Sequence, residues 1–318
     1  MAKTPPAKQY PAKTPSSRQN PAKKATGRPA GLFTWIAVGL VLVVVAALVI
    51  IKVTSGSPSA TNSNFQPTDS ATLAEVTAVP ASVFNAVGVK STVAPVSPPI
   101  PLAGQPALMG TSSTGASLPE VFYLGAEYCP FCAAERWSTI VALSRFGKFS
   151  GLGNTASSTL SGEVYPATQS FTFLKTTYAS KYLAFKGVEQ FTNVPDPATN
   201  FYYPLENPTA MESRLFKKYD TSKYIPGITA QQDGSIPFIS IGNKFLVSGA
   251  SYTPATLAGL SRSQIAAGLS DPTSPVTDAI IATANYQSAT FCVLTKNQPG
   301  SVCNSPGVAA AKKSMGLK

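Results

Sequence analysis

Two cysteines three positions apart carry the sharpest chemical signal in this sequence. Cys129 and Cys132 enclose Pro130 and Phe131 and follow the apolar run 121–125. Two thiols at this spacing on a helix start can close a small disulfide ring, and the helix N-terminus favours a thiolate on the first. Because the thiolate attacks in disulfide exchange, Cys129 is the candidate nucleophile and Cys132 the candidate resolving residue. This assignment requires a Cys129 sulfur that is exposed and ionises readily.

Three simpler interpretations of the pair stay open. It could be half of a zinc site, although Cys292 and Cys303 are poorly spaced for the other half and the chain has no histidine. It could be an inert structural disulfide, although so small a ring constrains little chain. It could also be a chance spacing. We expect no metal and no cofactor.

The second cysteine pair has a different spacing. Cys292 and Cys303 would close a loop of twelve residues, and a disulfide there would stabilise the fold by somewhat under about 3 kcal/mol in the chain-entropy model. We interpret this pair as a structural disulfide, because neither cysteine has an activating context. The rival interpretation is a second redox pair that relays electrons to or from Cys129 and Cys132.

A strand over residues 119–125 and a helix beginning at Pro130 should position the first pair. Proline suits the first helical position because its missing N–H would be unpaired there. The helix is expected to bury one apolar face, and we interpret Glu135 and Arg136 as a solvated pair. That face comprises Ala133, Trp137, Ile140 and Val141. Residues 147–153 should end the helix.

The remaining pattern predicts short elements around this unit. Residues 236–247 read as a hairpin with a Gly-Asn turn, and Thr253-Pro254 should open a helix as N-cap and first residue. We expect a frayed tail after Cys303. Further helices are predicted at 73–79, 83–87, 209–219 and 274–291, further strands at 171–176 and 182–188, and mostly loop at 90–118 and 220–234.

The N-terminal region accounts for most of the net charge of +11. Residues 1–31 hold seven Lys or Arg, no acid and many prolines, which predicts a disordered basic tail. Residues 32–51 carry no charge and are long enough for one transmembrane helix. Residues 52–70 read as a flexible stalk. The rest is nearly neutral, so we expect no nucleic-acid partner.

The charge asymmetry also predicts a location. A basic flank before an uncleaved apolar segment places the tail in the cytoplasm and the later residues outside, as a single-pass membrane protein. The even number of cysteines, all beyond that segment, suits an oxidising compartment.

At these residues the chain resembles the thioredoxin superfamily. The run 122–129 is similar to the strand and approach to its active site, and Ile236-Pro237 before a strand is similar to its cis-proline loop. The resemblance implies an α/β, thioredoxin-like fold with a central mixed sheet flanked by helices and a helical insert, over residues 71–270. A C-terminal extension with helix, disulfide loop and tail would follow over 271–318. Ile236 and Pro237 would then face the cysteines and offer backbone groups to an extended substrate, whereas an ordinary trans proline at a strand start is the alternative.

A longer resemblance covers about residues 70–305. The runs 125–137 and 142–147 are similar to a membrane-anchored thioredoxin-like family of bacteria and archaea, catalogued as a domain of unknown function. Tyr123 departs from the superfamily, since many thioredoxins carry a buried Asp six residues before the first cysteine. Glu127 is a candidate substitute, although we interpret it as an exposed surface acid.

The position of Phe131 also differs from the strongly oxidising members of the superfamily, which carry histidine there. Stabilisation of a thiolate would then depend on the helix terminus and on Arg136. We therefore regard Glu127, Phe131 and Arg136 as possible modulators of the cysteine pair.

Together these features predict a membrane-anchored, extracytoplasmic thiol-disulfide oxidoreductase. Its partners would be extended protein or peptide thiol clients and a redox partner that resets the pair. The alternative is a non-catalytic binding or scaffold module in which both cysteine pairs are structural disulfides.

Overall fold

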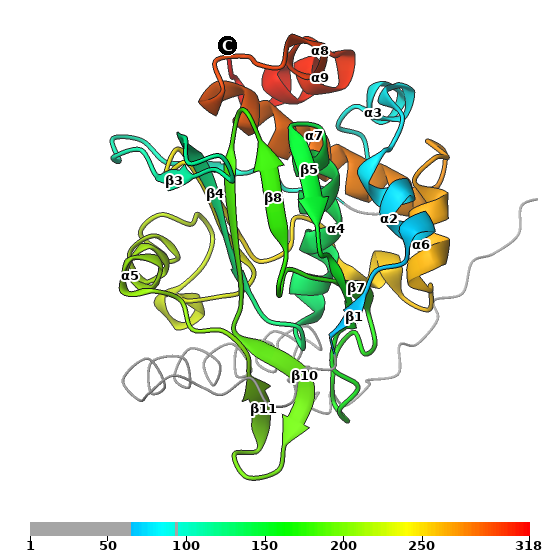
Figure 1. Cartoon of the computed structure of the whole chain (residues 1–318), viewed down its shortest axis with the longest axis vertical. Helices are drawn as coiled ribbons and strands as arrows, with labels where there is room; N and C mark the ends of the chain where they lie inside the picture. Colours follow the sequence, from blue (N-terminus) through cyan, green and yellow to red (C-terminus); the bar gives the residue numbers. More distant parts are fainter. Residues whose placement is uncertain (1–64, 93–94) are drawn as a thin grey trace, which may run out of the picture. The chain divides into compact units, whose positions relative to one another are not determined.

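The computed structural model describes residues 65–92 and 95–318 and shows a mixed α/β protein (Figure 1). The predicted basic tail, the predicted membrane span 32–51 and the stalk up to residue 64 lie outside the described residues. Within the part that is described, no helix combines the length and the hydropathy needed to cross a bilayer. Gln66 and Pro67, at the end of the predicted stalk, form strand β1.

Strand β4 (Ser117–Gly125) lies at the centre of the main sheet and leads into the cysteine pair. It runs antiparallel to β12 and to β3 and parallel to β9, so the sheet is mixed. The hydrogen-bonded order is β2-β13-β12-β4-β3, with β9 also on β4. The other strands are β2 (Ile100–Pro101), β3 (Met109–Thr111), β9 (Ala184–Glu189), β12 (Phe238–Ile241) and β13 (Phe245–Ser248).

The hairpin of β12 and β13 confirms the predicted Gly-Asn turn. Gly242 and Asn243 have φ angles of 60° and 53°, the left-handed region that Gly and Asn adopt more readily than other residues. Ile241 pairs with Phe245 across this turn. The hairpin places the segment before Phe238 beside the end of β4, where Phe238 pairs with Leu124.

Alternate residues of β4 face two different cores, as the two-residue period of a strand requires. Val121 and Tyr123 pack into a large core with helices α4 and α7. Phe122 and Leu124 face a second core that contains helix α5 and both cysteines of the first pair. The cysteine pair therefore belongs to the smaller core, although it lies at the start of α4, whose later residues line the large core.

Helix α4 (Pro130–Ser144) packs against α7 (Pro275–Leu294) (Figure 1). The residues after 270 thus share the large core with the sheet. The predicted α2, α3, α5 and α7 are confirmed, and the Thr209 and Glu212 side chains cap α5 reciprocally. The shorter helices are α2 (Ser70–Thr77), α3 (Ala81–Val87), α5 (Ala210–Tyr219), α6 (Arg262–Gly268), α8 (Gly300–Cys303) and α9 (Pro306–Met315), with 3₁₀ turns at Ala230–Gln232 and Pro254–Leu257.

Two expectations about the C-terminal half were wrong. Thr253 caps only a 3₁₀ turn, and α6 begins separately after Ser261. The tail after Cys303 does not fray: it forms α9, whose Val308 and Ala311 are buried in the large core. Apolar contact with α3 and α7 holds this short helix.

Short strands outside the main sheet also correct the sequence analysis. Residues 147–153, expected only to end α4, begin β5, and the strand expected at 171–176 ends at Thr172. Short edge strands lack the apolar alternation that identifies longer ones. They form three groups: β1 (Gln66–Pro67), β6 (Gly153–Ala156) and β7 (Gln169–Thr172); β5 (Gly147–Ser150) and β8 (Thr177–Ser180); β10 (Phe191–Asp196) and β11 (Phe201–Pro204).

Candidate functional site

Cys129 is the N-cap of helix α4. Its backbone is extended, with φ −79° and ψ 121°, and its sulfur accepts a hydrogen bond from the Cys132 amide at 3.4 Å. Pro130 occupies the first helical turn, as predicted. Both thiols are free in the structure. The Cys129 sulfur thus takes one of the N–H groups that a helix start leaves without a partner.

The cysteine pair is more buried than the sequence suggested. Cys129 exposes only 6 % of its surface and Cys132 none. The expectation of an exposed sulfur at 129 is therefore wrong for this conformation. The reason is the second core, in which Tyr128, Phe191 and Ile236 are buried together with both cysteines.

The two thiols differ in their ionisation. Burial raises the pKa of Cys129, but hydrogen bonds from the Cys132 thiol and amide and the charge of Arg136 outweigh burial and bring that pKa below the ordinary thiol value. Burial, and then the neighbouring Cys129, raise the pKa of Cys132 well above its ordinary value. The first thiol is thus the one that ionises more easily, which suits the predicted roles.

The predicted proline loop does lie against the pair. The Cys129 thiol donates to the Ile236 carbonyl over 3.8 Å, although 107 positions separate the two residues. The peptide bond between Ile236 and Pro237 is cis. The structure therefore brings Cys129, Cys132, Ile236 and Pro237 together at one end of β4 and β12.

Arg136 is not a solvated residue, which corrects the sequence analysis. Arg136 and Glu189 are both fully buried and form a bidentate ion pair, with Nε and Nη2 donating to the two carboxylate oxygens at 2.8 and 2.7 Å. Nη2 also donates to the Ala126 carbonyl at 2.7 Å. Burial lowers the pKa of Arg136, but the charge of Glu189 raises it by more. The pKa therefore lies well above its ordinary value, and the guanidinium stays charged.

Glu135 was also misjudged, because α4 has no solvent face. Its buried carboxylate accepts from the Ser251 amide at 2.8 Å and from Gln287 Nε2 on α7 at 2.7 Å. Burial raises the pKa of Glu135 to about 7. Glu135 thus joins the helix that carries the cysteine pair to the long helix behind it.

Glu127 is not an exposed surface acid either. It exposes 8 % of its surface, and burial, followed by the charge of Glu189, raises its pKa to about 7. Tyr123, which stands where the superfamily carries an acid, is fully buried and its hydroxyl has no hydrogen-bond partner among the described residues. Glu127 is therefore a titratable group near the pair, whereas Tyr123 stays neutral because burial raises its pKa.

Aromatic side chains surround the approach to the cysteines. Phe131, partly buried, meets Tyr165 edge to face with 5.9 Å between ring centroids. Tyr128 stacks on Tyr202 of β11 at 4.3 Å, and the Tyr202 hydroxyl is hydrogen-bonded to Ser158. These contacts tie the loop around Ser158 and the β10–β11 hairpin to the segment that precedes Cys129.

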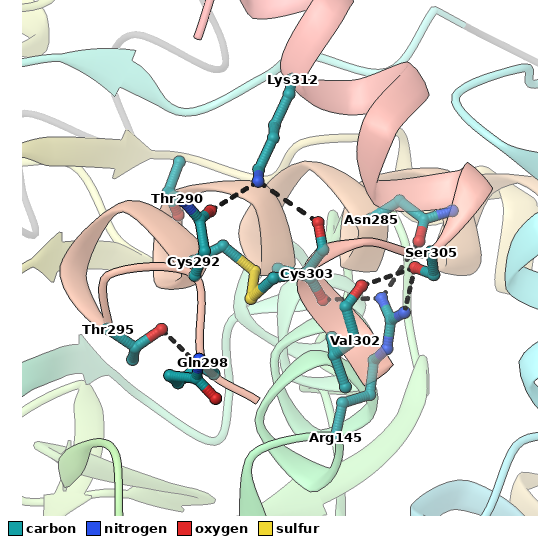
Figure 2. Close-up of a disulfide and its surroundings, with 12 residues drawn as sticks. Arg145, Asn285, Thr290, Cys292, Thr295, Gln298, Val302, Cys303, Ser305 and Lys312 are labelled. Atoms are coloured by element: carbon teal, nitrogen blue, oxygen red, sulfur yellow. Dashed lines mark hydrogen bonds between the residues drawn. A yellow bond between two sulfur atoms is a disulfide. The ribbon is translucent and has the colours of Figure 1, made fainter. Parts of the chain in front are cut away.

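The second cysteine pair forms a disulfide, which confirms its predicted oxidation (Figure 2). Cys292 at the end of α7 and Cys303 at the end of α8 are both buried. The Cys303 carbonyl accepts from Lys312 Nζ at 3.2 Å. The disulfide thus joins α7 to the chain that leads into α9.

Arg145, just after α4, holds the same region from the other side (Figure 2). Its guanidinium donates to Asn285 and Ser288 of α7 at 3.1 and 2.9 Å and to Ser305 at 3.2 Å. It also lies over the Phe84 ring, 4.0 Å from the centroid. All of these acceptors are neutral, and burial lowers the pKa of Arg145 to about 10.

Sequence reasoning missed the partner of Arg136. Glu189 lies 53 positions away at the end of β9, and its position directly after the predicted strand 182–188 was the available signal for a buried acid. In the described residues, no group of three or more His, Cys, Asp or Glu side chains could hold a metal ion.

Comparison with known proteins places this site within one family match. A family model described as "Domain of unknown function (DUF929)" matches residues 111–292, more than half of the chain. The match includes the first cysteine pair, the Ile236-Pro237 segment, Glu189 and Cys292. Neither the curated proteins nor the solved structures contain a match to the chain.

Proposed function

Because the chain belongs to the family described as a domain of unknown function (DUF929), we propose an activity from the site itself. The protein is a thiol-disulfide oxidoreductase that acts through Cys129 and Cys132. The single observation that carries this proposal is Cys129 at the helix N-cap, with the Cys132 amide on its sulfur. A sulfur in that position is stabilised as the thiolate, the form that attacks disulfides.

The proposed reaction balances without a cofactor. The Cys129 thiolate attacks one sulfur of a client disulfide, a mixed disulfide forms, and the other client sulfur leaves as a thiolate. Cys132 then loses its proton and attacks the Cys129 sulfur, which releases the second client thiolate. The client disulfide is reduced by two electrons and the Cys129–Cys132 disulfide forms; the reverse sequence oxidises a client dithiol.

We place the protein in the thioredoxin superfamily as part of this proposal. The support is the order of elements: a central strand, the cysteine pair at a helix start, a parallel strand, and a proline segment leading into an antiparallel hairpin. The Ile236 carbonyl beside Cys129 marks where an extended client backbone would lie. The clients are thus extended protein or peptide segments, and a separate redox partner resets the pair.

The proposed location is outside the cytoplasm, behind a single membrane anchor. The Cys292–Cys303 disulfide supports an oxidising compartment, since such bonds persist mainly there. The basic tail and the apolar segment 32–51 are the sequence features that support the anchor and its orientation.

A second candidate is a binding or scaffold module in which the first pair is structural. The observation in its favour is the 6 % exposure of Cys129, because an exchange reaction needs a client sulfur to reach that atom. In this alternative the first pair would stay oxidised at any physiological redox poise, and Cys132→Ser would leave function intact.

The deciding experiment uses the full-length protein. Cys132→Ser is incubated with a peptide disulfide and should accumulate a mixed disulfide on Cys129, while Cys129→Ser should trap none. The reduction potential of the wild-type first pair should lie above about −300 mV, the rough limit for resistant structural disulfides. No trapped adduct together with a potential below that limit would establish the scaffold alternative instead.

A further inference from the structure

A buried ion pair lies next to the cysteines without any contact to solvent. Arg136 and Glu189 are each 0 % exposed and are joined by two short hydrogen bonds. The carboxylate is held in turn by the Phe173 amide at 3.2 Å. Removing one member of such a pair leaves an uncompensated buried charge, whereas replacing both by apolar residues is often tolerated. Stability alone therefore does not explain why this core contains an ion pair.

Arg136 is directed towards the cysteine end of its helix. It follows Cys132 by four positions and Cys129 by seven, which places all three on one side of α4. Its Nη2 reaches back to the Ala126 carbonyl in the segment between β4 and the cysteines. Its Nη1 is buried and has no hydrogen-bond partner among the described residues. Nη1 is therefore the one nitrogen of the guanidinium that neither Glu189 nor the Ala126 carbonyl engages.

We propose that Glu189 is a positioning residue for the thiol chemistry: by pairing with Arg136 it holds the guanidinium in place and limits how much positive charge acts on Cys129. The inference deepens the proposed function and rests on it for its biological meaning. Arg136 favours the thiolate and Glu189 moderates that effect, so the pair adjusts how readily Cys129 ionises, in addition to the hydrogen bonds from Cys132. Neither residue touches the client.

The charges of Arg136 and Glu189 shift the pKa values of neighbouring groups in opposite directions. The Arg136 charge lowers the pKa of both thiols, and opposite charges within a few ångströms of a titrating group favour its ionised form. Glu189 acts in the other direction on its neighbours, since it raises the pKa of Glu127. The other titratable groups that face the cysteines or the ion pair are Tyr123 on β4, Glu127 and Tyr128 before α4, Tyr202 on β11, and Glu206, whose carboxylate accepts from the Glu189 amide at 2.9 Å.

The test is a thiolate titration of the reduced full-length protein, followed by ultraviolet absorbance between pH 3 and 10. Glu189→Gln keeps the side-chain shape and removes the negative charge, so the pKa of Cys129 should fall. Arg136→Gln should raise it. Each shift should be about one pKa unit. A merely structural role would move both variants in the same direction, because both destabilise the same core.

Glu135→Gln is the matched control. Glu135 is equally buried and adjacent to Arg136 on the same helix, but its hydrogen bonds go to Ser251 and Gln287. It should leave the Cys129 titration unchanged. Repeating the series in a Glu127→Gln background removes the neighbouring carboxyl that titrates near pH 7.

Either single variant could fail to fold, so Arg136→Met/Glu189→Met is included, because replacing both members of a buried pair by apolar residues is often tolerated. Its Cys129 pKa should lie above wild type and below Arg136→Gln. Shifts of the same sign in the two single variants, an unchanged pKa in the double variant, or an equal shift in Glu135→Gln would overturn the inference. If the Cys129 pKa values follow the expected order but neither the wild type nor any variant exchanges disulfides, the proposed function fails. The effect of Glu189 and Arg136 on the ionisation of Cys129 then still stands.

Discussion

The two cysteine pairs of this protein differ in the groups that surround their sulfur atoms. Cys129 and Cys132 lie at a helix start, where an amide, a guanidinium and a backbone carbonyl approach the sulfurs. Cys292 and Cys303 are buried among the apolar residues of the large core and are already joined. The difference teaches that position in the fold, more than spacing alone, separates the pair that we propose to react from the pair that is already a disulfide.

The largest difference between the pairs should appear in the exchange rate. Cys129→Ala should reduce disulfide exchange to the background rate of the solution thiols, because among the described residues no other cysteine caps a helix start. Cys292→Ala/Cys303→Ala should keep the wild-type rate. The measurement is reduction of a peptide disulfide by the full-length protein. Equal losses of exchange rate in the two variants would show that the two cysteine pairs do not differ in reactivity.

For the free energy of unfolding, loss of the second cysteine pair should have the larger effect. Cys292→Ala/Cys303→Ala should lower the free energy of unfolding by about 3 kcal/mol, since the bond closes a loop of twelve residues in the unfolded chain. Urea unfolding of the oxidised proteins measures this loss. Cys129→Ala/Cys132→Ala serves as the comparison and should cost less, because even when oxidised this pair closes a much smaller ring than Cys292 and Cys303. A larger loss in that variant would make the first pair the structural one.

Arg145 tests whether the region of the Cys292–Cys303 disulfide contributes to stability and not to exchange activity. Arg145→Met should lower the free energy of unfolding by about 2 kcal/mol, because three hydrogen bonds from a charged group are lost. Arg145→Lys, which keeps the charge but not the fork of donors, should recover part of that loss. Exchange activity should not change in either variant, and a parallel loss of activity would show that the two ends are coupled.

The smallest expected effect is a change in pH dependence at Glu135, which links α4 to α7. Burial raises its pKa from 4.5 to about 7, so the folded state binds more protons between these values. Its contribution to stability is full below pH 4.5 and is lost as the pH rises through 7. Glu135→Gln should reduce the slope of unfolding free energy against pH by up to about 1.4 kcal/mol per pH unit in this window.

Urea unfolding at a series of pH values checks this. Glu127→Gln is the control on the cysteine side, because Glu127 also has a pKa of about 7 and should remove a similar share of the slope. An unchanged slope in Glu135→Gln would mean that Glu135 is already ionised in the folded protein, and that it does not couple the two regions through its proton.

Local signals predicted most of the elements that build the site. Pro130 marked the start of α4, the Gly242-Asn243 turn marked the hairpin, and Thr209 marked α5, because caps and turns depend on neighbours in sequence. The placement of Ile236 beside Cys129 followed from a resemblance to a known fold. The reactivity of the cysteines, predicted from their spacing at a helix start, stays a prediction.

The failures were of tertiary origin. An amphipathic interpretation of α4 assumed a solvent face, but the sheet, β7 and α7 enclose the helix, so Glu135 and Arg136 are buried. Their partners Gln287 and Glu189 come from distant segments that no local pattern connects. The helix after Cys303 could have been found: Ser305-Pro306 opens it and Gly316, with φ 66°, ends it.

The length of α4 fixes how the two sulfur pairs can communicate. Cys129 caps one end of this fifteen-residue helix, and Arg145 at the other end holds the segment beside Cys303, so about 22 Å of helix lies between them. Thiol exchange needs sulfur atoms at bonding distance, which excludes a direct handover within one folded chain. In the proposed reaction, electrons that arrive at Cys129 must therefore leave on another molecule, and the distant disulfide would take no part in the exchange.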